Sequence, residues 1–165
     1  MLALIWSELR EFAHDVAGPE SAARFGEEGP GVLAERLNRL ADLAGEKPPE
    51  LLRAFGRRLF ERFVRLYPDF VPADLEALDY LEHIERHVHQ ELRALYPSAK
   101  PPQLCCVRVA PDRLLIRYGS DQPVAEMCEG MIEAALSHFE ARAEIRRRAA
   151  RGGGAVFEVS LVEAA

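Results

Sequence analysis

Hydrophobic side chains in the first two thirds of the chain recur every three or four residues, which is the spacing of one face of an α-helix. Glycine and proline residues separate these runs, as at Gly18-Pro19, at a glycine-rich turn around residues 26–31, and at two Tyr-Pro pairs. A proline suits the first turn of a helix, so the third run is expected to begin at the Pro48-Pro49 pair. The pattern predicts helices over residues 2–16, 32–43, 48–66 and 74–95.

The period changes after residue 102, where short strand-like runs replace the helical spacing. The predicted strands cover residues 104–109, 114–118, 143–148 and 155–162, and one further helix covers 122–140. Helices, a hairpin, one helix and a second hairpin therefore follow one another along the chain. This order predicts a single α+β domain over residues 1–165, in which a helical N-terminal half (1–97) packs on a small antiparallel sheet with one crossing helix (98–165).

The composition fits a soluble globular domain and narrows the function classes. Of 165 residues, 48% are hydrophobic and 29% are charged, and the net charge of −6 argues against a nucleic-acid binder. No run of eighteen apolar residues predicts a membrane span, and the N-terminus lacks the basic start of a signal peptide. Three cysteines, two of them adjacent, make a poor disulfide framework, so we expect a reducing, cytoplasmic location.

The sequence contains no motif that indicates an enzyme. It lacks G-x-S-x-G, C-x-x-C and a phosphate-binding glycine loop, and no carboxylates form a recognisable acid/base pair. The thiols of Cys105 and Cys106 should point to opposite faces of a strand, and Cys128 has no evident activating base. His83 and His87 are four residues apart on one helix and could share a metal ion, but a third ligand is not evident. We interpret this pair as part of a solvated helix face.

His89 differs from the other histidines because it lies at the margin of the apolar stripe of its predicted helix. Its spacing allows two interpretations. It could be a half-buried histidine at the edge of the core, hydrogen-bonded to a backbone carbonyl. It could also be an axial ligand whose other ring nitrogen faces a cofactor in an apolar pocket.

Several segments, in order, resemble the H-NOX (heme nitric-oxide/oxygen-binding) family. PPELLRAFGRRLFERFVRLYPDF is similar to a family helix that opens with L-L-x-x-F-G, and HVHQELRALYPSAKPPQL resembles the family's heme-ligand stretch. YGSDQ lies where the family has Y-x-S-x-R, and EGMIEAALSHF resembles the helix that follows. The resemblance covers about residues 48–140, and the N-terminal region is shorter than is usual in the family.

The resemblance implies a site for heme b. Aligned on Tyr-Pro at 96–97, the ligand histidine is His89, and the proline that presses on the macrocycle is Pro102. Tyr118 and Ser120 match two of the residues that hold the propionates. Gln122 stands where the family has arginine, so the charged fork that would bind a carboxylate is missing.

Met127 occupies the position at which oxygen-binding members carry a tyrosine. A thioether cannot donate a hydrogen bond to bound oxygen, so the resemblance implies a sensor of nitric oxide that also binds carbon monoxide. It would signal to a separate partner, such as a histidine kinase or a cyclic-dinucleotide enzyme. The alternative is a heme-free interaction or small-molecule-binding module on the same fold, for which Gln122 and the short N-terminal region are the evidence.

Overall fold

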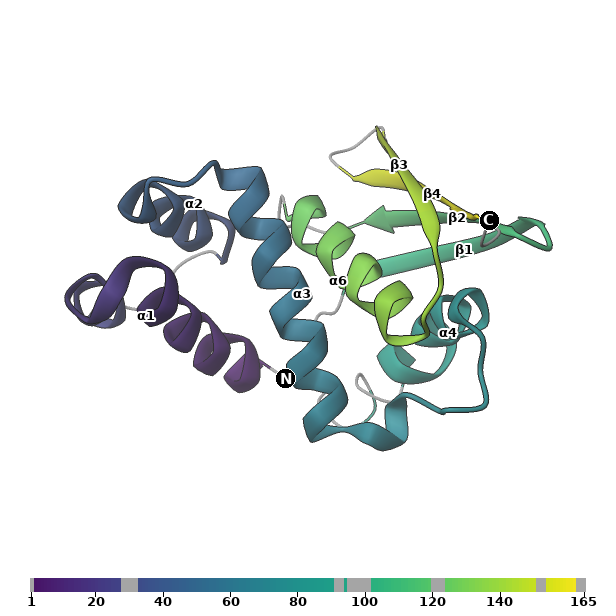
Figure 1. Cartoon of the computed structure of the whole chain (residues 1–165), viewed down its shortest axis with the longest axis horizontal. Coiled ribbons are helices and arrows are strands. Elements are labelled where there is room, and N and C mark those ends of the chain that lie inside the picture. Colours follow the sequence, from purple (N-terminus) through teal and green to yellow (C-terminus); the bar gives the residue numbers. More distant parts are fainter. Residues whose placement is uncertain are drawn as a thin grey trace.

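The computed structural model describes residues 2–27, 33–90, 94, 102–119, 124–150 and 154–162. The helical half contains α1 (Leu2–Glu27), α2 (Leu33–Ala44), α3 (Pro48–Leu66), a 3₁₀ turn η1 (Pro68–Phe70), α4 (Ala77–His83) and a π-helical turn η2 (Ile84–His89). Figure 1 shows α3 in the middle of the molecule, with α1 and α2 on one side and α6 and the sheet on the other. None of the described helices is long and apolar enough to cross a membrane.

Helix α1 contains the first predicted helix and a second helical stretch that the sequence does not predict. Gly18 interrupts α1 with φ 78° and ψ 169°, a left-handed φ that glycine adopts without strain. Pro19 then begins a second helical stretch that runs to Glu27, because its fixed φ suits a first helical turn. The predicted end of the first helix at Gly18-Pro19 is therefore confirmed as a kink, but the chain returns to helix at Pro19, and Gly26 lies in helix rather than in the predicted turn.

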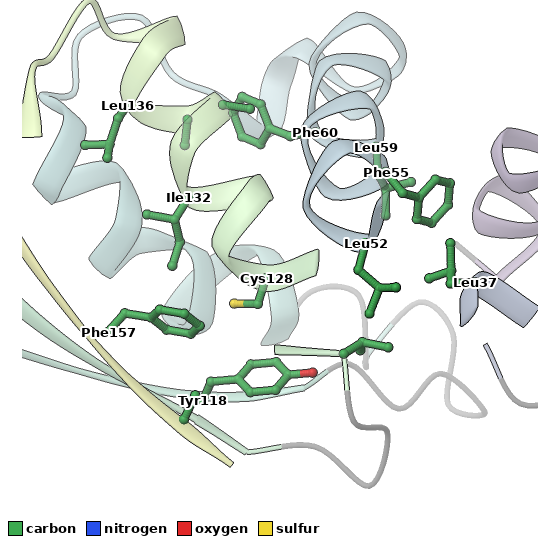
Figure 2. Packing of buried hydrophobic residues seen from close by; sticks show 14 of the residues in the cluster. Leu37, Leu52, Phe55, Leu59, Phe60, Tyr118, Cys128, Ile132, Leu136 and Phe157 are labelled. Carbon is green, nitrogen blue, oxygen red and sulfur yellow. The ribbon is translucent and has the colours of Figure 1, made fainter. Parts of the chain in front are cut away.

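The sheet follows the predicted pattern of two hairpins. Its strands β1 (Gln103–Ala110), β2 (Arg113–Gly119), β3 (Ala143–Ala149) and β4 (Ala155–Leu161) lie in the order β1-β2-β4-β3, and every neighbouring pair is antiparallel. Helix α6 (Ala125–His138) crosses one face of this sheet. Figure 2 shows Tyr118 and Phe157 on that face, below Cys128 and Ile132 of α6. The predicted α+β architecture is confirmed.

Helices α3 and α6 form the most extensive contact between elements in the described structure. A methyl group at Gly56 would overlap the Met127 carbonyl oxygen, and a methyl group at Gly130 would overlap the Arg53 carbonyl oxygen. Each helix thus uses a glycine to bring its backbone against the other. Ion pairs flank this contact, with Arg53 3.2 Å from Glu129. We call the contact between α3 and α6 at these two glycines the glycine seam.

The fourth predicted helix is not one regular helix. Residues 72–76 form a turn, α4 begins only at Ala77, and from Ile84 the chain widens into the π-helical turn η2, which includes His89. A π-helix bonds residue i to i+5 and often appears as a single turn at a functional site. The prediction of one helix over residues 74–95 is wrong in this respect, and residues 91–93 and 95 lie outside the described structure.

Candidate functional site

An apolar cavity of about 150 Å³ lies where the helical half meets the sheet. Elements from both halves of the molecule contribute to its wall, among them Ile5 of α1, Phe60 of α3, Tyr80 of α4, Ile116 of β2 and Ile132 of α6. Aliphatic and aromatic side chains dominate the lining. Among the described lining residues, His89 alone brings a basic nitrogen.

The cavity gathers the predicted site residues that the structure describes. His89 of η2, Pro102 before β1, Tyr118 of β2 and Met127 of α6 all line it. These residues are far apart in the sequence and come from four different segments. Ser120 and Gln122, the other two predicted residues, lie outside the described part of the chain.

The imidazole of His89 is held by a carboxylate. Its side chain is 12% exposed, and Nδ1 lies 2.8 Å from Oε2 of Glu85, one helical turn earlier. A carboxylate oxygen only accepts hydrogen bonds, so Nδ1 is the donor, and in the neutral imidazole the lone pair is then on Nε2. This bond leaves Nε2 as the ring atom that can bind a metal from the cavity wall. The partner of Nδ1 is thus a carboxylate and not a backbone carbonyl.

The wall that carries His89 is joined to β1 through polar contacts. Arg108 of β1 donates to Asp79 at 2.7 Å and to Glu82 at 3.0 Å, both on α4. The thiol of Cys106, also on β1, lies 3.6 Å from the Leu81 carbonyl oxygen. We call α4, η2 and their contacts with β1 the proximal wall.

The other histidines and the cysteines do not form a reactive group. The rings of His83 and His87 stack with centroids 4.0 Å apart, so the expectation that they share a helix face is confirmed. Burial, and then His87, lower the pKa of His83. Burial raises the pKa of the Cys106 thiol to about 11, and it raises that of Cys128 further still. In the part of the chain that the structure describes, no three His, Cys, Asp or Glu side chains are grouped to hold a metal ion.

Comparison with known proteins identifies the family. The model of the family described as Haem-NO-binding matches residues 32–147, well over half of the chain. The chain belongs to the Haem-NO-binding family. No match was found among curated proteins.

Solved structures of H-NOX proteins show the same fold. The unliganded Fe(II) H-NOX protein from K. algicida is 20% identical, with 97% of this chain and 96% of that chain covered and a TM-score of 0.85. An H-NOX protein from S. oneidensis in the Fe(II)NO ligation state is 16% identical, with 97% and 98% covered and a TM-score of 0.85. An oxygen-binding H-NOX domain related to soluble guanylate cyclases, in its oxygen complex, is 19% identical, with 96% and 94% covered and a TM-score of 0.76. The fold of this Haem-NO-binding chain is therefore the H-NOX fold.

Sequence reasoning missed Glu85, although its contact with His89 bears directly on the site. The available signal was the four-residue spacing, which brings side chains together on a helix. That signal is weak here because the segment EALDYLEHIERHVHQE holds several acidic residues at similar spacings. Only the geometry separates Glu85, which contacts the imidazole, from Glu82, which contacts Arg108.

Proposed function

We propose that this chain is a heme-based gas sensor domain and that His89 is the proximal ligand of heme iron. The observation that carries the proposal is the position of a single imidazole, with its Nδ1 engaged by Glu85, in the wall of an apolar cavity. Membership of the Haem-NO-binding family supports the same function. The group that we propose is heme b.

The donor set at the cavity fits heme better than a bare metal ion. One nitrogen ligand among apolar side chains suits a cofactor whose iron already has four ring nitrogens and whose faces are apolar. A cavity near 150 Å³ holds a molecule of the size of benzene, and a macrocycle is several times larger, so heme binding must displace lining side chains. Met127 and Met131 line the cavity and have the most adaptable side chains for this.

When bound, heme would supply an iron that can bind a diatomic gas. The residues of this chain would hold and orient the group. Pro102 would press on the macrocycle, and the Tyr118 and Ser120 hydroxyls would hydrogen-bond the propionates, with Gln122 giving an uncharged amide in place of a charged fork. Met127 offers no hydrogen-bond donor, so nitric oxide and carbon monoxide should bind without a stable oxygen complex.

The signal would pass to a separate protein, such as a histidine kinase or a cyclic-dinucleotide enzyme. The chain itself would not be an enzyme. A single domain over residues 1–165 and a cytoplasmic location stay predictions from the sequence.

The alternative function is a heme-free module that binds a partner or a small apolar molecule on the same fold. The size of the cavity favours this alternative, since a benzene-sized ligand would fit without rearrangement. The absence of arginine at Gln122 favours it too.

An absorption spectrum tests the proposal. The protein expressed with added heme should show a Soret band that His89→Ala abolishes or shifts. His87→Ala is the matched control, because His87 is an exposed histidine two residues away on the other side of the helix. The same ferrous sample should bind nitric oxide and carbon monoxide and form no lasting oxygen adduct. A protein without a Soret band, or one in which His87→Ala is the damaging change, would contradict the proposal.

A further inference from the structure

One oxygen atom of Glu85 joins two elements of the proximal wall. Its Oε2 accepts a hydrogen bond from His89 Nδ1 at 2.8 Å and another from the backbone N–H of Leu104 at 3.2 Å. His89 lies on η2, whereas Leu104 lies on β1. The Glu85 side chain is 27% exposed and that of His89 is 12% exposed, so water competes only partly for these bonds.

A carboxylate acts on an imidazole more strongly than a neutral acceptor does. A hydrogen bond with an ionised partner is shorter and about twice as strong as one between neutral groups. When a metal-ligating histidine donates such a bond, its ring orientation is fixed and the nitrogen on the other side of the ring becomes a stronger ligand. Glu85 is therefore placed to act on His89 Nε2 through the ring.

The neighbouring carboxylates of α4 do not share this position. Asp79 and Glu82 both accept hydrogen bonds from Arg108 of β1. Glu82 is three residues before Glu85 and is also partly buried, with 21% of its side chain exposed. It is therefore a matched control, with the same chemistry on the same wall but a different partner.

We propose that Glu85 is a positioning residue that strengthens the bond between His89 and heme iron and couples that bond to β1 through Leu104. This inference rests on the proposed function. It goes further, because it assigns to one side chain both the strength of the ligand bond and its mechanical connection to the sheet. A shift of the His89 ring would move the Glu85 carboxylate. Because the Leu104 amide donates to the same oxygen, that movement would reach β1.

Resonance Raman spectroscopy of the ferrous, heme-loaded protein tests the effect on the bond. In Glu85→Gln the iron–histidine stretching band should move to lower frequency, because an amide oxygen accepts without a charge. Heme should also pass to apomyoglobin on the order of 10-fold faster than from the unaltered protein. Glu82→Gln should change neither the band nor the rate of heme loss.

A second measurement does not need heme. In the apoprotein, nitrogen-15 chemical shifts of histidine should show His89 with its proton on Nδ1, and Glu85→Leu should remove that preference. Glu85→Asp keeps the charge but shortens the side chain by one methylene, and it serves if Glu85→Leu does not fold. It should weaken the preference for Nδ1, and Glu82→Gln should leave it unchanged.

The possible failures can be told apart. A heme-loaded protein that depends on His89 but whose iron–histidine band is the same in Glu85→Gln would overturn this inference and leave the proposed function in place. An apoprotein with the His89 proton on Nε2 would overturn the inference as well. Failure of the unaltered protein to bind heme through His89 would overturn the proposed function and this inference with it.

Discussion

The glycine seam and the proximal wall border the same cavity but are built in opposite ways. At the seam, the backbones of α3 and α6 touch at Gly56 and Gly130, and no space remains for even one methyl group. In the proximal wall, α4 buries part of its surface but Val88 is the only buried residue of η2, and hydrogen bonds from polar groups connect α4 and η2 to β1. Close-packed backbones cannot slide without overlap or voids, whereas partly exposed polar contacts can exchange with water to some degree.

Because of this difference in packing, we expect the seam to be rigid and the proximal wall to be movable. Met127 lines the cavity from α6, on the close-packed side, and His89 lines it from η2, on the side held by polar contacts. A change at the cavity should therefore displace the proximal wall and leave the seam in place. Three measurements on the apoprotein test whether the seam is the more rigid of the two regions.

The largest effect is expected at the seam. Gly130→Ala places a methyl group against the Arg53 carbonyl oxygen, which belongs to a helix backbone and cannot turn away. We expect the free energy of unfolding to fall by about 3 kcal/mol or more. Urea denaturation measures it.

The matched control for this change is Gly119→Ala. A methyl group there would meet Gln103 at the ordinary distance of 3.9 Å, so the cost should be under about 1 kcal/mol. Equal stability of the two variants would mean that α3 and α6 separate readily, and the contrast with the proximal wall would disappear.

A smaller loss is expected where α1 contacts α3. Glu8 is 2% exposed and lies 2.9 Å from Arg62 and 3.4 Å from Arg58, both on α3. Glu8→Ala removes a buried carboxylate, but the two arginines are about one third exposed and can turn to water. The loss in free energy of unfolding should thus be about 2 kcal/mol, below the usual cost of breaking a buried pair.

Glu11→Ala is the control on the same helix. Glu11 is 53% exposed and lies 3.5 Å from Arg58, so its removal should cost less than about 1 kcal/mol. A loss at Glu8 as large as that at Gly130 would show that the outer helices are held as rigidly as the seam.

The smallest effect is a difference in thiol reactivity. At pH 8 the exposed Cys105 should react first with a disulfide reagent, because burial raises the pKa of Cys106 to about 11 and that of Cys128 further, so few of their thiolates form. Cys106 lies in the proximal wall and Cys128 on α6, so in Cys105→Ser the Cys106 thiol should react before Cys128. Mass spectrometry of timed samples measures the order. Faster reaction of Cys128 would show that α6 opens to reagent more readily than the proximal wall, which is the opposite of what we expect.

The sequence predicts the regular elements well where local chemistry sets both ends. Helix α3 begins at Pro48 and ends at Leu66, as predicted. Proline suits the first turn of a helix, which sets the start, and the residue before a proline disfavours helix, so Pro68 sets the end. The strands follow from two-residue alternation, and the structure moves their ends by only one residue. The sequence does not predict the second stretch of α1, because the Gly18-Pro19 pair indicates the end of one helix and does not show that Pro19 begins another.

Other features depend on partners that are distant in the sequence. A π-turn of six residues has too few apolar positions to distinguish its period from that of an α-helix, so η2 was not predicted. Gly56 and Gly130 are visible as single glycines in helical runs, but neither run shows which helix approaches it. The helical spacing marks His89 as a residue at the edge of the core, but only the resemblance groups it with Pro102, Tyr118 and Met127, since no local pattern brings four segments to one cavity.

The strand order has a consequence for synthesis on the ribosome. β2 pairs with β1 immediately before it, but its other edge pairs with β4, the last described strand, and β3 pairs with β4 alone. Until residues 155–161 have emerged, the edge of β2 and all of β3 lack their neighbours, although α3 and α6 are already complete. Open strand edges are templates for pairing with other chains. A chain that stalls before residue 155 would therefore hold an intact helical half beside an unfinished sheet, and such a nascent chain would be a natural client for a chaperone.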